Sequence, residues 1–439
     1  MNRFPATDER TQHWSDRPRL SATGDFLQRL APFVAVAALA YPVLVWPLLE
    51  AQVVSLEPVY GLPPVDGPPS ALLRIYFSTI FVLGLAALGV QYGTRPLGAT
   101  RPLLLALAAY IVWAGITGFW AVEPDISTRR FLLAVFITGG IVSSTLATRD
   151  IDQLLRVAFW MFAGMTVLCA ASVLTTAPTA LGHAAIYPHK NYFAAITSVM
   201  AAFAFYQLTN GTRLTKLVAC VMLLAAVWFL VEARSKACTA LFVLAPLVAY
   251  TAAAIARTTR ISPAITLTAL GLTLFGIYQF GAVAGIWDFH AAATAIFGDP
   301  TLTQRTDIWA FALRKIEEAP WLGYGYEVFW GAGPNSPSVR EGPGFVAQMP
   351  HAHNGYIDIA LQTGLVGLSI FIVLMLSALH ACGRLARTHL GLAGFLLSII
   401  VFSLLYNFLE TTFFRSFGAQ SMAMVLVITI VSQCWERTR

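Results

Sequence analysis

Two histidines near the end of a long polar segment are the first candidates for chemistry in this sequence. His351 and His353 lie in the run MPHAHNGYID, directly before an apolar stretch. A neutral imidazole accepts a proton near pH 7, because the unperturbed pKa of histidine is about 6.5. Asn354 or Asp358 is close enough in sequence to orient such a ring. The pair predicts a general base acting on a substrate hydroxyl, with helix capping and loop hydrogen bonds as the structural alternative.

The same histidines also allow a metal site. A spacing of two residues places both rings on one face of an extended strand rather than of a helix. A metal needs at least a third ligand, and the sequence shows no HExxH motif and no DxD-like acidic cluster near the pair. We therefore expect no metal and no other cofactor.

Basic residues form the second group of candidates. Arg234 lies in a short charged turn between two apolar stretches, Arg305 lies in the long polar segment, and Lys190 follows His189 in the run YPHKN. Guanidinium groups match phosphate oxygens in a bidentate way. Together the set predicts a site for an anion such as a lipid diphosphate. Taken singly, each arginine is explained as well by pairing with a nearby carboxylate.

Glu410 and Asn407 stand at the end of another apolar stretch, close in sequence to Arg415. Such residues either bind substrate hydroxyls or form an ion pair at a helix end, and the ion pair is the simpler interpretation. Glu410 is therefore only a supporting candidate.

The composition places all of these residues in a membrane protein. Hydrophobic residues make up 57% of the 439 residues and charged residues only 11%, whereas soluble domains carry about 25% charged residues. The net charge of +6 fits the excess of lysine and arginine on the cytoplasmic side of membrane proteins, so nucleic acid is not an expected partner. None of the five cysteines lies in the long polar segment, so we expect no disulfide framework.

Hydropathy predicts an all-α polytopic fold with about twelve spanning helices. The expected spans are 30–49, 71–91, 103–121, 131–147, 154–174, 192–208, 217–231, 237–255, 262–284, 356–376, 393–408 and 417–433. Residues 1–29 and 434–439 are the expected cytoplasmic tails of a single transmembrane domain, 30–433. The distribution of lysine and arginine puts both termini inside.

The large gap in hydropathy, 285–355, then faces the outside, between the ninth and tenth helices. At roughly 70 residues it far exceeds an ordinary connection, and long loops are usually functional. Residues 303–313 predict a short amphipathic helix within it, followed by a stretch rich in glycine and proline.

Several motifs resemble the O-antigen ligase/polymerase superfamily, including its exopolysaccharide-polymerase branch. His353-Asn354, nine further residues, then Gly364 and Gly367 fit the His-[Asn/Ser/Gln]-x9-Gly-x-x-Gly signature of O-antigen ligases. Further similar features are the runs RSK at 234–236, RTDIW at 305–309, PWLGYG at 320–325 and HAHNG at 351–355.

The resemblance implies a membrane glycosyltransferase of the GT-C type in the bacterial inner membrane, with its active site facing the periplasm. Such an enzyme transfers a glycan from undecaprenyl diphosphate, either to another lipid-linked repeat unit (a polymerase) or to lipid A–core (a ligase). His353 would be the catalytic base, and Arg234 and Arg305 would hold the donor diphosphate, with Lys190 and His189 as plausible additions. The resemblance also implies a metal-independent, inverting reaction, with membrane lipids and other polysaccharide-assembly proteins as partners.

Two other functions are compatible with the composition. A transporter or flippase of lipid-linked glycans is the main alternative, but transporters usually carry interrupted helices and ionisable residues near the middle of the membrane. Here the polar candidates gather near one surface. A non-catalytic assembly subunit is disfavoured by the histidine signature. The signature spacing selects His353 over His351, and the residues leave polymerase and ligase open, with a weak preference for polymerase.

Overall fold

The computed structural model describes residues 22–49, 71–92, 101–286, 304–415 and 418–437, together with the isolated residues 288, 291 and 294. Over these ranges the chain is helical, and the only β pairing recorded there is an isolated bridge between Thr179 and Gly182. An all-α fold, as predicted, is therefore confirmed. His290 and most of 287–303, in the predicted outer loop, lie outside the described residues.

The long helices follow the predicted spans. They are α1 (Ala22–Ala40), continued by α2 (Trp46–Leu49), α3 (Ala71–Tyr92), α4 (Pro102–Ile116), α5 (Pro124–Ala147), α6 (Ile151–Thr175), α7 (Lys190–Asn210), α8 (Arg213–Ala233), α9 (Lys236–Thr259), α10 (Pro263–Val283), α14 (Gly355–Ala386), α15 (Leu390–Tyr406) and α16 (Ala419–Arg437). Among the described residues, ten helical stretches are long and apolar enough to cross a membrane, and α15 and α16 are shorter apolar helices. These twelve stretches coincide in position with the predicted spans.

The helix ends differ from the hydropathy boundaries. α1 begins at Ala22 and α16 extends to Arg437, so helical structure continues into both predicted tails. The charged turn predicted between 231 and 237 is a true break, because Arg234 takes a left-handed conformation with φ of 50° and ends α8. Ser235 then starts α9.

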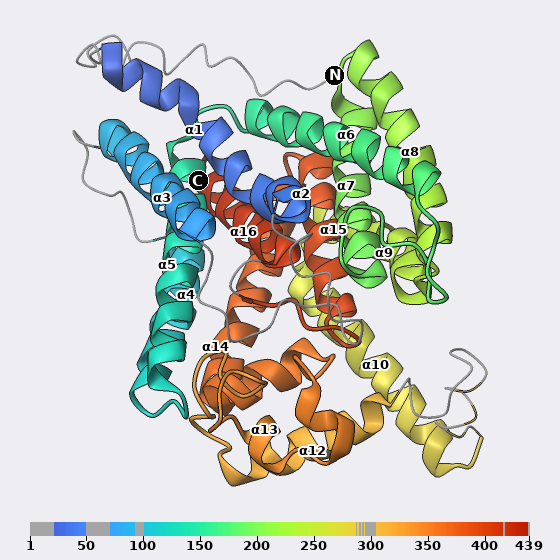
Figure 1. Ribbon diagram of the computed structural model, residues 1–439. Helices are drawn as coiled ribbons and strands as arrows, with labels where there is room; N and C mark the ends of the chain where they lie inside the picture. Colours follow the sequence, from blue (N-terminus) through green and yellow to red (C-terminus); the bar gives the residue numbers. More distant parts are fainter. Residues whose placement is uncertain are drawn as a thin grey trace.

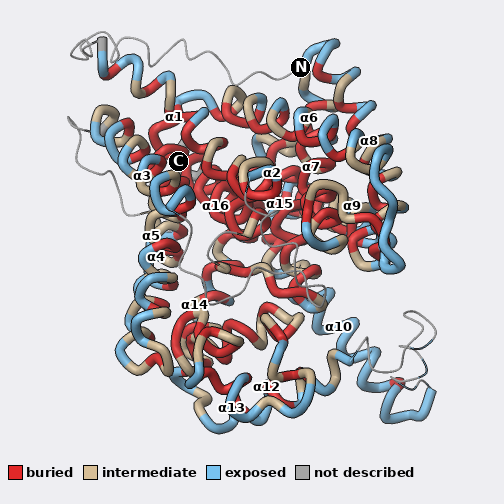
Figure 2. Tube along the Cα trace, viewed as in Figure 1, coloured by how far each residue is buried: buried red, intermediate tan, exposed pale blue. Residues whose placement is uncertain are grey.

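The helices form a bundle with one extensive hydrophobic core (Figures 1 and 2). The closest pairs are α9 with α15, α3 with α5, and α7 with α8. Small buried residues on α9, among them Ala245, Ala249, Ala253 and Ala256, allow α15 to approach closely, which is how helices associate where there is no hydrophobic drive from water. α4, α8 and α10 expose apolar side chains, as expected for surfaces in contact with lipid. Figure 2 shows the exposed residues that run along α10.

The described part of the large loop is a small folded unit at one end of the bundle (Figure 1). It contains α12 (Arg305–Glu318), α13 (Pro337–Glu341) and the 3-10 helix η5 (Gly344–Gln348). A second hydrophobic core, which includes Phe311, Phe329 and Trp330, joins α12 and η5 to the first turns of α14. The short amphipathic helix predicted within 303–313 is thus present, and it continues to Glu318.

α14 is broken at Gly364, where φ is 68° and ψ is −178°. The strap 320–325 lies against the break and supplies partners for the backbone groups that the break leaves unpaired. Tyr324 N–H donates to Leu361 O at 2.8 Å, and Leu365 N–H donates to Pro320 O at 2.8 Å. The two halves of α14 are therefore held at a defined angle, and the first half carries the histidines at its start.

Candidate active site

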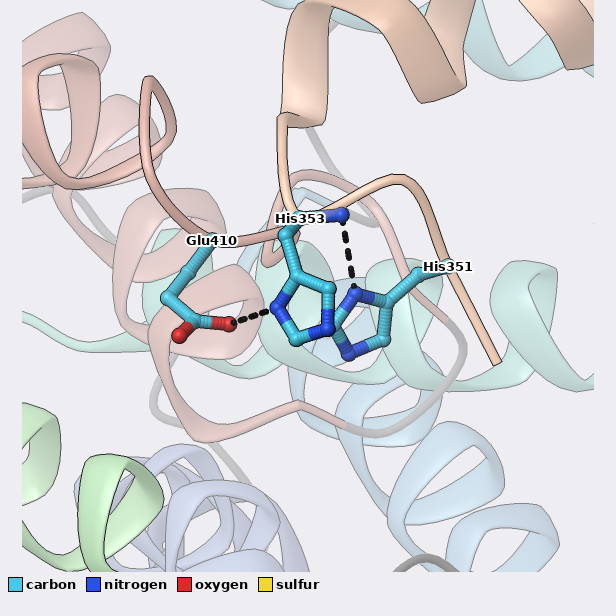
Figure 3. A group of neighbouring side chains, drawn as sticks. All are labelled: His351, His353 and Glu410. Atoms are coloured by element: carbon cyan, nitrogen blue, oxygen red, sulfur yellow. Dashed lines mark hydrogen bonds and ion pairs between the residues drawn. The ribbon is translucent and has the colours of Figure 1, made fainter. Parts of the chain in front are cut away.

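The two histidines lie in the turn 350–354, which we call the histidine turn, immediately before α14. His353 has a φ of 51°, a conformation that costs a non-glycine residue roughly 1–3 kcal/mol and that is often found at functional sites. The backbone N–H of His353 donates to Nδ1 of His351 at 3.1 Å. The ring centroids are 4.2 Å apart. The turn therefore places both imidazoles side by side (Figure 3), without the strand geometry that the spacing suggested.

His351 is the buried member of the pair. Burial lowers the pKa of His351 well below its usual value, and nearby His353 and Arg415 add to the effect. Its Nδ1 is occupied as a hydrogen-bond acceptor, so the neutral ring carries its proton on Nε2. His351 is thus suited to support the turn rather than to exchange protons at neutral pH.

His353 is oriented by Glu410, a residue 57 positions away in the sequence. Nδ1 of His353 lies 3.1 Å from Oε2 of Glu410 (Figure 3). Burial alone would raise the pKa of Glu410, but the hydrogen bond from His353 and the charge of Arg305 outweigh burial and lower this pKa overall. Because the ionised carboxylate can only accept, Nδ1 of His353 donates and Nε2 keeps the lone pair that can take a proton.

Arg305 completes a buried chain of charged groups. One of its terminal nitrogens donates to Oε1 of Glu410 at 3.1 Å, and the side chains are only 14% and 11% exposed. The sequence also allowed a local ion pair for Arg305 and a helix-end pair between Glu410 and Arg415. The structure instead shows a long-range ion pair between Arg305 and Glu410. Arg305 begins α12 and Glu410 follows α15, so the pair joins the loop unit to the bundle.

Asn191 is a site residue that sequence reasoning missed. Its side-chain N–H donates to Oε1 of Glu410 at 2.8 Å, and its side-chain oxygen accepts from the hydroxyl of Ser235 at 3.4 Å. The Tyr406 hydroxyl donates to its backbone oxygen at 3.2 Å. Asn191 therefore connects the carboxylate beside His353 to the turn that carries Arg234. The only sequence signal was its place in the polar run YPHKN.

The remaining predicted cations lie around this centre. His189 caps α7 and accepts from Asn191 N–H at 3.2 Å, and it lies within electrostatic range of Glu410 and Arg305. Lys190 donates to Leu181 O at 2.7 Å and lies within electrostatic range of Arg234. The structure thus brings Arg305 and His189 to the Glu410 centre, whereas Lys190 and Arg234 are near enough to repel each other and have no recorded contact with Glu410.

Neither Asn354 nor Asp358 contacts the imidazole of His353 directly in the hydrogen bonds that the structure records for them. The side-chain oxygen of Asn354 accepts from Tyr356 N–H at 3.0 Å and Ile357 N–H at 3.2 Å, so Asn354 caps α14. Its backbone N–H donates to the hydroxyl of Thr411. Asn354 therefore fixes where the helix starts, and thereby where the histidine turn ends.

His351, His353 and Glu410 also have ligand atoms within 4.8 Å of one another, so the group has the size of a metal site. Two of the possible donor atoms are already engaged, however. Nδ1 of His351 accepts a backbone N–H, and Oε1 of Glu410 accepts from the Arg305 cation. A metal ion in this group would lie close to the fixed positive charge of Arg305, which favours the proton-transfer interpretation.

Comparison with known proteins agrees with these features. A family model described as O-Antigen ligase matches residues 193–372, a range that includes Arg234, Arg305 and the histidine turn. The chain is also similar to "Exopolysaccharide production protein ExoQ" of Rhizobium meliloti (strain 1021), with 24% identity over 299 residues. That match covers 64% of this chain and 66% of the relative.

The matched range ends shortly after the Gly364–Gly367 part of the histidine signature, so it contains the long loop before α14 together with the signature. The predicted resemblance is therefore confirmed: this multi-pass membrane protein contains a region, residues 193–372, that matches the O-antigen ligase family model, and it is similar to a protein of exopolysaccharide production.

Proposed function

We propose that this protein is a glycosyltransferase that polymerises lipid-linked glycan repeat units at the periplasmic face of the bacterial inner membrane. The observation that carries the proposal is the chain His353–Glu410–Arg305. In it, one carboxylate contacts both a possible general base and an arginine of the kind that binds phosphate groups. The exopolysaccharide relative favours polymerisation over ligation to lipid A–core.

In the proposed reaction, a hydroxyl oxygen of the acceptor sugar attacks the anomeric carbon of a glycan carried on undecaprenyl diphosphate. The bond between that carbon and the diphosphate oxygen breaks as the new glycosidic bond forms. The hydroxyl proton passes to Nε2 of His353, and Glu410 stabilises the imidazolium that results. The undecaprenyl diphosphate leaves with the bonding electrons.

Arg305 and Arg234 are the proposed partners of the leaving diphosphate, with Lys190 and His189 in support. Cations fixed before the reaction stabilise the charge that develops on the leaving group without further reorganisation. This role requires no metal ion, and attack from the side opposite the diphosphate inverts the anomeric centre. The side chain of His353 is partly exposed, at 26%, and Nε2 is the ring nitrogen that does not face Glu410.

The test is a reconstitution in lipid vesicles with an undecaprenyl-diphosphate-linked repeat unit, with and without lipid A–core, and with EDTA in a parallel sample. Ladders of lipid-linked glycan without core support a polymerase. Transfer only in the presence of core identifies a ligase instead. Movement of labelled glycan lipid across the bilayer without transfer identifies a flippase, and loss of transfer in EDTA contradicts the metal-free chemistry.

His353→Ala and Glu410→Gln separate the proposed roles. His353→Ala removes the base, and we expect transfer to fall by about 10²–10⁴-fold while the donor still binds. Glu410→Gln is nearly isosteric but removes the charge that stabilises the imidazolium, so its kcat falls as well. His380→Ala is the matched control, because that histidine lies on α14 near the opposite end and contacts Ser262. Normal ladders from His353→Ala would refute the proposed mechanism.

A further inference from the structure

Asp358 is a buried carboxylate beside the active site for which the proposed reaction has no direct use. It lies in the first turn of α14 and is 1% exposed. Its Oδ1 accepts from the indole N–H of Trp330 at 2.6 Å. Its Oδ2 accepts from the hydroxyl of Thr411 at 2.5 Å. Both oxygens of this buried carboxylate therefore accept hydrogen bonds, and these bonds fix the positions of the groups around it.

The third partner of Asp358 is the peptide between the two histidines. The N–H of Ala352 lies 3.2 Å from Oδ1 and 3.1 Å from Oδ2. The carbonyl oxygen of Ala352 accepts from the indole N–H of Trp309 on α12 at 2.9 Å. The residue between His351 and His353 is therefore held at both its amide and its carbonyl group.

The Thr411 contact reaches the other half of the catalytic pair. Thr411 directly follows Glu410, and its hydroxyl also accepts the backbone N–H of Asn354 at 3.2 Å. The two oxygens of Asp358 thus hold the residue before His353 and the residue after Glu410. These are two segments that the sequence separates by more than fifty residues.

We propose that Asp358 is a positioning residue: through Ala352 and Thr411 it fixes the distance between the imidazole of His353 and the carboxylate of Glu410. This inference rests on the proposed function and adds a residue that touches neither the donor nor the acceptor. Without the carboxylate, the histidine turn and the segment 410–412 lose their common anchor. A displacement of about 1 Å in a reacting group can cost about 100-fold in rate.

Thr411→Val is the sharpest test, because it keeps the volume of the side chain and removes both of its hydrogen bonds. We expect kcat for glycan transfer to fall about 10- to 100-fold, while KM for the lipid-linked donor stays the same, since Thr411 bonds to Asp358 and Asn354 and to none of the proposed donor-binding cations. Thr411→Ser restores the hydroxyl and should restore kcat. Asp358→Asn keeps an acceptor for Trp330 but not for Thr411, and should resemble Thr411→Val.

Thr429→Val is the matched control, since Thr429 is equally buried and its hydroxyl donates to Val425 O of its own helix. It should keep the wild-type kcat. Unchanged kcat in Thr411→Val and Asp358→Asn overturns the positioning role, as does a loss that appears mainly in KM or that Thr411→Ser fails to restore. An inactive wild-type protein overturns the proposed function instead, so the two failures are distinguishable.

Discussion

At the scale of single residues, Glu410 divides its two oxygens between two tasks. Oε2 faces Nδ1 of His353, whereas Oε1 accepts from Arg305 and Asn191. A buried carboxylate that carried only the imidazole contact would be costly to ionise. The hydrogen bond with His353 and the charge of Arg305 outweigh burial and lower the pKa of Glu410, and a charged Glu410 fixes the tautomer of His353.

Asn191 gives a prediction at this scale. Asn191→Leu keeps a similar volume but removes an N–H donor to the charged Glu410, a bond worth about 1.5–3 kcal/mol. We expect kcat of glycan transfer to fall about 10- to 100-fold, with the loss measured in the reconstituted assay. Asn210→Leu, at the exposed far end of the same helix, is the control. Equal activity of the two variants would contradict a role for Asn191 in the site.

At the scale of elements, the histidine signature contains both the proposed base, His353, and the glycine at which α14 is broken, Gly364. A Cβ on Gly364 would lie 2.0 Å from Trp321 O, and a Cβ on Gly323 would lie 2.7 Å from the backbone N of Gly364. The glycines thus allow the strap 320–325 to lie directly on α14. Gly367 sits beside Thr363, whose carbonyl accepts from the Trp113 indole. The spacing of the signature therefore sets the length of the first half of α14, from the histidine turn to the break at Gly364.

Gly364→Ala tests this interpretation. The added methyl group meets backbone rather than a movable side chain. The backbone conformation itself, with positive φ and ψ near 180°, is essentially restricted to glycine and costs other residues about 1–3 kcal/mol. We expect a lower Tm in detergent and a loss of transfer, because the first half of α14 moves with the histidine turn. Gly271→Ala on α10 is the control, since a Cβ there meets nothing within 4 Å. A wild-type Tm for Gly364→Ala would refute the close contact.

The elements could be predicted because the membrane restricts the backbone to helices, so apolar length alone finds them. The break in α14 could not, because its backbone groups are satisfied by a strap some forty residues earlier in the chain. The same limit applies to the site. The residue types of His353, Arg305 and Glu410 suggested chemistry, but the contacts of Glu410 with Arg305 and with Asn191 join segments whose distance only the folded bundle determines.

At the scale of the whole molecule, His351 links stability to pH. Its pKa in the folded protein lies well below the unfolded value of about 6.5, with burial as the largest cause. The unfolded chain therefore binds the extra proton first. The contribution of this residue is complete above pH 6.5 and is lost as the pH falls below that value, by up to about 1.36 kcal/mol per pH unit.

We expect the Tm of the wild-type protein to fall between pH 7.5 and pH 5.5, and to fall less for His351→Asn. Asparagine cannot be protonated in this range and can still accept the backbone N–H of His353. Thermal unfolding of both proteins in the same detergent measures the two slopes. Parallel slopes would show that His351 is not the group that titrates.

The orientation of the molecule is the remaining property on which the proposed function depends. The histidine turn and α13 belong to the loop that the charge distribution predicts to lie outside, whereas the connection after α9 is predicted to lie inside. Arg340 on α13 and Thr259 at the end of α9 are both exposed, so a cysteine at either position is open to reagents. Among the described residues Cys220 is the native cysteine that is exposed, and Cys220→Ala provides the background.

We expect a membrane-impermeant maleimide to label Arg340→Cys in intact cells and to label Thr259→Cys only after the cells are broken. Lipid-linked glycans and their acceptors meet at the outer face in the proposed reaction, so the loop unit must lie there for His353 to act. The reverse pattern would place His353, Glu410 and Arg305 in the cytoplasm. The chemistry of the site would then have to serve a cytoplasmic sugar donor, and the periplasmic polymerase proposed for this protein would be wrong.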